Sequence, residues 1–299
     1  MGIKGKLGRW IHEFLKDRRQ SVRVQGINSD ESDVISSVPQ GTVLAPLLFI
    51  IVLSDIDKDI TGSKIISFAD DTKISKDINN EDDLAILQSD VNKVCKWAID
   101  NNMTFNTEKF QLLRYGKKEN LKKTQYVLNH GHNIQEQEQA KDLGIVMNKN
   151  ANFSAQIEIS TNKAKRTMGL IFRTFQRRDK ELMLPLLKTL IIPILEYCSV
   201  LTAPYKQEEI SRIEGIQRHF TSKIEGLNHA TYHERLQILN LYSLERRRER
   251  YMIIYAWKIL EGHVANLPKN PLAIKQTLES RRGRICQVPN LVTKQCQTL

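Results

Sequence analysis

A pair of adjacent aspartates is the feature of this 299-residue chain whose residue types most directly indicate chemistry. Asp70 and Asp71 separate two short segments, 64–68 and 72–75, in which apolar and polar residues alternate. Alternation with a period of two predicts strands, so we expect a hairpin with the pair at its tip. Carboxylate oxygens are preferred ligands of hard divalent cations, and two such cations about 4 Å apart drive nucleotidyl transfer. The pair therefore predicts a metal site, although an acidic pair is also typical of a solvated turn.

The loop Pro39-Gln40-Gly41 is a second candidate, because its residues suit contact with a nucleotide. Glycine permits close approach of the backbone, and the amide of Gln40 can both donate and accept hydrogen bonds. An ordinary strand-to-helix turn is the alternative interpretation. Pro46 then falls in the first turn of a predicted apolar helix that runs to about residue 57, a position where proline is tolerated.

The elements that must position these residues predict an α+β fold. Side chains of Asn79 and Asn80 can cap a helix that follows them. The other predicted elements are a helix over 7–15, strands over 21–25 and 105–115, two strands around a His130-Gly131 turn within 126–147, and only helices from about 154 to 262. The segments expected in the core are 44–53 and 182–195, together with Trp10, Trp97 and Trp257.

Charge is distributed unevenly along the chain, whose formal net charge is +11. Residues 1–116 contain 15 Lys+Arg and 17 Asp+Glu, a net charge of −2, and residues 117–299 contain 30 and 17, a net charge of +13. A slightly acidic first part can hold divalent cations, and a basic second part can follow a phosphate backbone. The run of residues 246–250, which contains four arginines, is open to two interpretations: a nucleic-acid contact or a solvated helix face.

The chain also predicts where the protein resides. Its four cysteines have no framework spacing, which favours reduced thiols inside the cell, in the nucleus or the cytoplasm. The first residues form no apolar signal sequence, and the most apolar stretch, 44–53, is about half the length of a membrane span. We therefore expect no membrane association, and the oligomeric state stays open.

Several segments in one order resemble the reverse transcriptases of non-LTR retrotransposons, over about residues 5 to 262. In the first part these are the segment 37–49, Phe68-Ala69-Asp70-Asp71, Trp97, Phe105-Asn106, Lys109 and the segment 141–146. In the second part they are the segments 195–198, 216–218, 232–236 and 244–248. The resemblance implies an RNA-directed DNA polymerase that uses an RNA template, a DNA primer and deoxynucleoside triphosphates, with two Mg²⁺ ions that Mn²⁺ could replace.

The resemblance also implies roles for individual residues. Asp70 and Asp71 match the metal-binding pair, and Pro39-Gln40-Gly41 matches the loop beside the templating base and the incoming nucleotide. Lys109 matches a lysine proposed to protonate pyrophosphate or to order the triphosphate, with a plain surface lysine as the alternative. Leu143-Gly144 resembles the hairpin that grips the primer end, with an ordinary tight turn as the alternative.

The same resemblance implies domain boundaries, and it shows where this sequence differs from the family pattern. We expect a partial palm over 1–116, a primer-grip-like hairpin over 117–150, a helical thumb-like region over 151–262 and an irregular tail over 263–299. The family's third catalytic aspartate, its fingers and any endonuclease would precede Met1. Ser37 and Ala45 stand where glycine is common in the family, which reduces backbone freedom. We therefore expect no polymerase activity, or very weak activity, from the chain alone.

Two functional hypotheses remain open at this point. The first is a reverse transcriptase fragment of a mobile element, and the intact Asp70-Asp71 pair favours it. The second is a non-catalytic nucleic-acid-binding module derived from such an enzyme, which salt-dependent binding without primer extension would favour. A purely structural protein would leave the separated charge and the ordered motifs unexplained.

Overall fold

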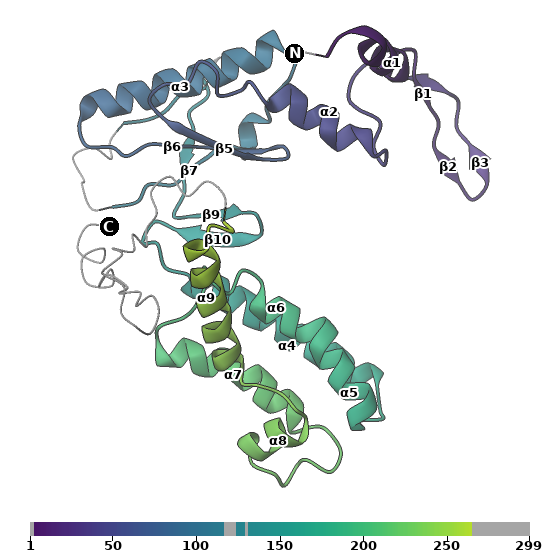
Figure 1. The fold of residues 1–299 in the computed structure, drawn as a ribbon, viewed down its shortest axis with the longest axis vertical. Coiled ribbons are helices and arrows are strands. Elements are labelled where there is room, and N and C mark those ends of the chain that lie inside the picture. The colour runs from purple at the N-terminus through teal and green to yellow at the C-terminus, as the bar shows by residue number, and fades with distance from the viewer. Residues whose placement is uncertain (1–2, 117–123, 129–130, 265–299) are drawn as a thin grey trace, which may run out of the picture. The chain divides into compact units, whose positions relative to one another are not determined.

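The structure is a computed structural model, which describes residues 3–116, 124–128 and 131–264. It combines helices with two-stranded antiparallel sheets, which confirms the α+β class (Figure 1). The chain divides into two compact units: unit 1 contains residues 1–110 and 118–135, and unit 2 contains residues 111–117 and 136–299. The connector 117–123, His130 of the predicted turn and the tail from 265 lie outside the described residues.

Unit 1 begins with a helix and an antiparallel ribbon. The ribbon pairs β1 with β4 and β2 with β3 around a turn at Gln25-Gly26. The elements of this unit in chain order are α1 (Gly5–Leu15), β1 (Arg19–Gln20), β2 (Arg23–Val24), β3 (Ile27–Asn28), β4 (Ser32–Asp33), α2 (Leu44–Leu53), β5 (Lys64–Phe68), β6 (Asp71–Ser75), α3 (Glu81–Asp100) and a 3-10 turn (Thr107–Lys109).

The hairpin β5–β6 lies beside α3 in Figure 1, and its residue Ile74 packs against a small core on that helix. Val91 and Cys95 of α3 form a small core with Leu128, and Ile74 of β6 packs against that core from the hairpin. The side-chain amide of Gln88 exchanges two hydrogen bonds with the backbone of Val127, at 2.7 and 2.9 Å. The predicted helix after Asn79-Asn80 is therefore present, and it supports the hairpin from one side.

Several predicted core positions are wrong. Trp10 stacks on Phe14 but is 52% exposed, and Trp257 is 51% exposed. In α2 only Ala45 and Leu48 are buried, and the helix ends at Leu53 rather than near residue 57. An apolar helix predicts burial on all sides, but here only one face of α2 finds neighbours among the described residues.

The predicted strand over 105–115 is also wrong in most of its length. The side chain of Asn106 accepts a hydrogen bond from the backbone of Glu108, at 3.1 Å, and starts the 3-10 turn Thr107–Lys109. Asparagine often competes in this way with strand pairing. Only the two-residue strand β7 (Gln111–Leu112) remains, and it lies beside β8 (Gln135–Glu136).

Among its described residues, unit 2 contains β7, the hairpin β9–β10 and, from residue 154 to residue 264, helices without strands, as predicted. Buried side chains from α4, α5, α6 and α7 form one core that includes the fully buried Met183, Leu187 and Phe220. The segment 182–195 therefore supplies core residues, as expected. The elements are β9 (Gln139–Asp142), β10 (Ile145–Asn148), α4 (Ser154–Thr174), α5 (Lys180–Leu186), a π-helical turn (Leu187–Ile191), α6 (Ile192–Glu196), α7 (Gln207–Thr221), α8 (Tyr232–Ile238) and α9 (Leu244–Leu260).

Within the residues that the structure describes, every helix is too short or too polar to cross a bilayer.

Candidate functional site

The hairpin β5–β6 presents both aspartates at its tip, as predicted. Phe68 pairs with Asp71, so that Ala69 and Asp70 form a two-residue turn and Asp71 begins β6. Ala69 has a φ of +52°, a left-handed conformation that a two-residue hairpin turn requires. Both carboxylates are exposed, which leaves their oxygens accessible to a cation.

The base of this hairpin is tied to α3 by a lysine. The Lys76 ammonium donates to the Gly62 carbonyl oxygen at 3.0 Å and forms an ion pair with Asp83 at 3.1 Å. Asp83 also forms a capping box with Asn80 at the start of α3. Hydrogen bonds from the Asn79 backbone and from Lys76 lower the pKa of Asp83. The residues before β5 and after β6 are thus held together, which fixes the direction in which the tip projects.

A hollow of about 560 Å³ lies at the tip of the hairpin. It brings Asp70 and Ala69 together with Gln40 and Gly41, although these segments are distant in sequence. Its other lining residues are mostly apolar and come from the loop and the first turns of α2: Val38, Thr42, Val43, Ala45, Pro46 and Phe49. The hollow is shallow and open to solvent. An apolar wall beside a carboxylate and an amide is a surface on which a nucleobase and its sugar could lie.

The loop Pro39-Gln40-Gly41 owes its shape to a local hydrogen-bonded turn. The Pro39 carbonyl accepts from the Thr42 hydroxyl at 2.9 Å, and that hydroxyl in turn accepts from the Ala45 backbone at 3.2 Å. Gly41 has a φ of +82°, which glycine adopts without strain. Pro39 itself does not line the hollow, so its role here is to orient the two residues after it.

Ser37, which stands where glycine is common in the family, has a strained backbone conformation. Its φ is +74°, in the left-handed region that favours glycine, and the Arg18 guanidinium holds its carbonyl at 2.5 Å. Ala45, by contrast, is helical and buried, so its methyl group is accommodated. The loop beside the hollow therefore contains one strained residue at Ser37.

The remaining predicted site residues lie elsewhere. Lys109 ends the exposed 3-10 turn of unit 1 and does not line the hollow. Leu143 and Gly144 belong to unit 2, where they form the two-residue turn between β9 and β10, with φ values of +46° and +84°. Two positive φ values define a tight hairpin turn with Gly at its second position. Asp70 therefore lines the same hollow as Gln40 and Gly41. Lys109, Leu143 and Gly144 are not among the residues that line it.

The donor set at the hairpin tip suits a hard cation but is small. Asp70 and Asp71 supply carboxylate oxygens, and residues 3–116, 124–128 and 131–264 contain no group of three or more His, Cys, Asp or Glu that could hold a metal ion. A two-metal site requires bridging carboxylates, so the pair alone is an incomplete ligand set.

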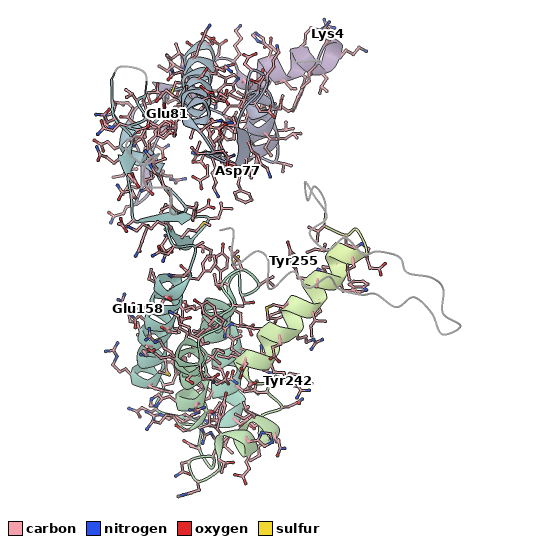
Figure 2. The ribbon with its side chains drawn as sticks, turned by 90° about the vertical axis from the view of Figure 1, so that its left-hand side faces the viewer. Lys4, Asp77, Glu81, Glu158, Tyr242 and Tyr255 are labelled. Atoms are coloured by element: carbon pink, nitrogen blue, oxygen red, sulfur yellow. The ribbon has the colours of Figure 1, made fainter. Side chains whose placement is uncertain are left out.

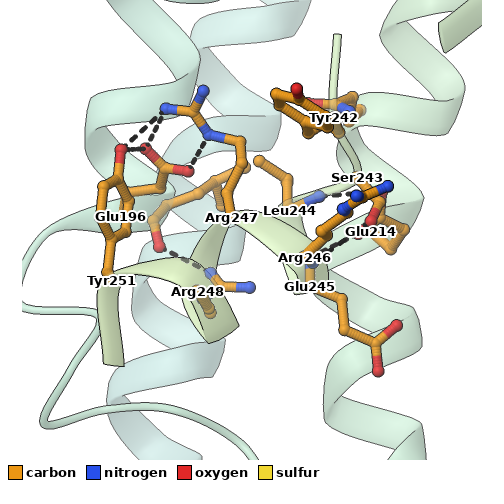
Figure 3. A network of polar contacts seen from close by, with 12 residues as sticks. Glu196, Glu214, Tyr242, Ser243, Leu244, Glu245, Arg246, Arg247, Arg248 and Tyr251 are labelled. Carbon is orange, nitrogen blue, oxygen red and sulfur yellow. Dashed lines mark hydrogen bonds and ion pairs between the residues drawn. The ribbon is translucent and has the colours of Figure 1, made fainter. Parts of the chain in front are cut away.

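The arginine run of α9 is not uniformly solvated: Arg246 and Arg250 are exposed, but Arg247 and Arg248 are part of the internal structure (Figure 3). The Arg247 guanidinium donates to both carboxylate oxygens of Glu196, at 2.5 and 2.8 Å. Arg248 is only 6% exposed and donates to the Leu195 carbonyl at 2.8 Å. Hydrogen bonding to Glu196 raises the pKa of Arg247, and burial lowers the pKa of Arg248.

Glu214 completes the attachment of α9. Its carboxylate accepts from the backbone N–H groups of Leu244 and Glu245, both at 3.2 Å, and from the hydroxyl of Tyr232 (Figure 3). A carboxylate at a helix N-terminus is favourable because free N–H groups point at it. Burial, together with the hydrogen bond to Glu214, raises the pKa of Tyr232. Glu214 of α7 and Arg247 and Arg248 of α9 thus find their hydrogen-bond partners within unit 2.

A basic stripe on α4 is the better candidate for a phosphate contact. Lys163, Arg166 and Arg173 are exposed and recur at spacings of three and seven residues, which places them on one side of the helix. Lys165 is exposed on the flank of this stripe. Glu158 is the acidic residue of α4, and Figure 2 labels it on the same helix. We call Lys163, Arg166 and Arg173 the α4 stripe.

Sequence reasoning missed several residues that shape these sites. Thr42, Phe49 and Lys76 lack a distinctive signal, because each acts through a partner that is remote or belongs to the backbone. Tyr197 lies in a segment already singled out, 195–198, but its contact with the β9–β10 turn spans 54 residues of sequence.

Comparisons with known proteins identify the family to which the chain belongs. The family described as "Reverse transcriptase (RNA-dependent DNA polymerase)" matches residues 1–167. A protein named "Probable RNA-directed DNA polymerase from transposon X-element" from Drosophila melanogaster is 24% identical over 254 residues, which are 81% of this chain and 28% of that protein. The "RNA-directed DNA polymerase from mobile element jockey" from the same organism is 25% identical over 233 residues, which are 72% of this chain and 25% of that protein.

No solved structure matches the chain. The chain spans about a quarter of the length of the curated relatives it matches. Because the family match covers more than half of its residues, the chain belongs to the reverse transcriptase (RNA-dependent DNA polymerase) family.

Proposed function

We propose that this chain is the palm and thumb part of a non-LTR retrotransposon reverse transcriptase, which in its intact parent copies RNA into DNA by two-metal nucleotidyl transfer. The observation that carries the proposal is the hollow in which Asp70 lies beside Gln40 and Gly41. A metal-bound triphosphate and its base need these two kinds of surface next to each other.

Each residue then has a defined task. Asp70 and Asp71 would hold Mg²⁺, which activates the primer hydroxyl and neutralises the leaving group when bound. Gln40 and Gly41 would contact the incoming nucleotide or the templating base, and Pro39 would keep them in place. Lys109 would order the triphosphate or protonate pyrophosphate. The turn Leu143-Gly144 of unit 2 would contact the primer end.

The proposal includes weak activity of the chain alone, because its two carboxylates form an incomplete set for two metals. The experiment is primer extension on an RNA template with Mg²⁺ or Mn²⁺, beside Asp70→Asn/Asp71→Asn. A matched control is Asp59→Asn/Asp77→Asn, which removes two exposed carboxylates of unit 1 outside the hollow. Robust extension that only Asp70→Asn/Asp71→Asn abolishes would contradict weak activity but support the catalytic role.

Metal binding can be tested without catalysis. Mn²⁺ added with a deoxynucleoside triphosphate should broaden NMR signals near a bound ion, because the unpaired electrons relax nearby nuclei. We expect broadening of residues 68–72 and 40–42, and its loss in Asp70→Asn/Asp71→Asn. Equal broadening in that variant and in the unmodified chain would refute a metal site at the hairpin tip.

The α4 stripe supports the second candidate, a nucleic-acid-binding module without catalysis. Lys163, Arg166 and Arg173 project from one exposed side, whereas Arg247 and Arg248 are engaged internally. Each phosphate contact contributes about 0.7–0.9 to the slope of log affinity against log salt. Replacing the three residues of the stripe by Gln should therefore reduce that slope by about 2–3 for an RNA–DNA hybrid.

The matched control replaces three exposed cations elsewhere in unit 2, Lys206, Lys223 and Arg250, by Gln. Fluorescence anisotropy at several salt concentrations gives both slopes. An equal loss in the two triple variants would show that binding depends on net charge rather than on the α4 stripe. Binding that depends on the stripe, in a chain whose metal test fails, would favour the non-catalytic module.

A further inference from the structure

We propose that Tyr197 is a positioning residue, which holds the β9–β10 turn in the place where it contacts a primer end. The inference rests on the proposed function of Leu143-Gly144 as the primer contact. The Tyr197 hydroxyl donates a hydrogen bond to the Leu143 carbonyl at 2.8 Å. Its ring also lies against Gly144, since a Cβ built on that glycine would stand 3.5 Å from Tyr197 Cε1.

The turn needs an external support because its own conformation is unfavourable at one position. Leu143 has a φ of +46°, a left-handed conformation that is unfavourable for a residue with a side chain. Leu143 is also 45% exposed, so the turn is not held by complete burial of this residue. A hydrogen bond to the carbonyl of the same residue favours the strained conformation directly.

The other end of the hairpin is already attached to the helices. The Val146 backbone N–H donates to the Gln156 side chain of α4 at 3.0 Å, and Gln156 is buried. The Asn148 side chain makes further bonds to the backbone of Asn150 and Asn152. Strand β10 is therefore fixed along its length, and the tip is the part of the hairpin that depends on Tyr197.

Tyr197 is itself placed by the polar network of Figure 3. It follows directly after Glu196, which the Arg247 guanidinium holds by two hydrogen bonds. The next residue, Cys198, has a φ of +52°, so the chain reverses immediately beyond the tyrosine. Helix α9 thus determines where Glu196 lies, Glu196 determines where Tyr197 lies, and Tyr197 determines where the turn lies.

This arrangement gives the ion pair of α9 a consequence beyond stability. The tip carries an exposed apolar side chain, Leu143, and an exposed aromatic ring, Tyr197, side by side. Such a surface suits the apolar edge of a sugar at a primer end rather than a phosphate. Fixing it in advance lowers the entropy lost when a primer end binds.

The test uses the full chain with Tyr197→Phe, which keeps the ring and removes the hydroxyl. Tyr205→Phe is the matched control, because Tyr205 is 80% exposed and the substitution removes the same hydroxyl oxygen. One hydrogen bond of about 1 kcal/mol corresponds to a factor of about 5. We expect amide hydrogen exchange of Asp142 and Ile145, the pair that closes the turn, to be about 5-fold faster in Tyr197→Phe and unchanged in Tyr205→Phe.

A second readout tests the consequence for nucleic acid. The probes are an RNA–DNA hybrid with a recessed primer 3′ end and a blunt hybrid of equal length. We expect the unmodified chain to prefer the recessed end, and Tyr197→Phe to lose about 5-fold of that preference while its affinity for the blunt hybrid is unchanged. A general loss of folding would lower both affinities together.

The outcomes separate this inference from the proposed function. Unchanged exchange in Tyr197→Phe overturns the inference whatever the chain binds. Faster exchange with an undiminished preference for the recessed end also overturns it. If exchange is faster but the unmodified chain shows no preference for the recessed end, the turn is not a primer contact, and the proposed function of Leu143-Gly144 fails instead.

Discussion

Removing the guanidinium of Arg247 should destabilise unit 2 far more than removing a neighbouring arginine from the same run. Arg247→Met leaves the carboxylate of Glu196, whose side chain is only 10% exposed, without its two charged donors. Breaking a fully buried ion pair costs about 3–5 kcal/mol, and breaking an exposed one costs about 0–1 kcal/mol. The Arg247 side chain is 29% exposed, so we expect about 2–3 kcal/mol.

Urea unfolding followed by far-ultraviolet circular dichroism measures this loss, because unit 2 is mainly helical after residue 154. With a slope of about 2 kcal/mol per molar urea, the midpoint should fall by roughly 1 M. Arg250→Met is the control, since Arg250 is exposed on the same helix and loses the same charge; its effect should stay within about 0.5 kcal/mol. Equal midpoints for the two variants would refute the conclusion that Arg247 is internal.

Three further predictions concern unit 1. Gly62→Ala should lower the stability of unit 1 by about 1–3 kcal/mol in thermal denaturation, because the new Cβ would overlap Ile86 Cγ2. In the control Gly169→Ala the added Cβ would have no atom within 4 Å, so this variant should instead stabilise unit 2 by up to about 1 kcal/mol. If Gly62→Ala leaves the stability unchanged, the close contact with Ile86 is absent. Ser37→Gly should raise the free energy of unfolding by about 0.5–1 kcal/mol in denaturant titration. The relief of backbone strain at a φ of +74° should exceed the entropy that glycine adds to the unfolded chain. A decrease in the free energy of unfolding would show that the strain is absent. The pKa of Asp83 is lower in the folded chain than in the unfolded one, so its stabilisation is complete above about pH 4 and is lost as pH falls through the folded value. Hydrogen exchange at the start of α3 should accelerate in that acid range, and Asp83→Asn should remove the pH dependence.

Local patterns in the sequence predicted the features that depend on near neighbours. Alternation around Asp70-Asp71 specified the hairpin, because side chains of a strand point to opposite faces in turn. The side chain of Asn80 indicated the start of α3, because it satisfies a backbone donor that the helix leaves free. The order of the motifs indicated a reverse transcriptase, and the family match over residues 1–167 confirms that assignment. Each of these inferences needs only residues a few positions apart or their order along the chain.

Burial and long-range partners required the tertiary structure. Composition alone predicted burial for Trp10 and for all of α2, but burial depends on whether another element covers a given face. The run of arginines looked uniform in the sequence. In the structure Arg247 binds Glu196, which lies 51 residues away, so its guanidinium points toward the interior of unit 2. The same reasoning applies to Asp70. Asp70 shares a hollow with Gln40 and Gly41 because the fold of unit 1 brings their loop to the hairpin tip. A shared hollow depends on distance in space rather than on separation in sequence.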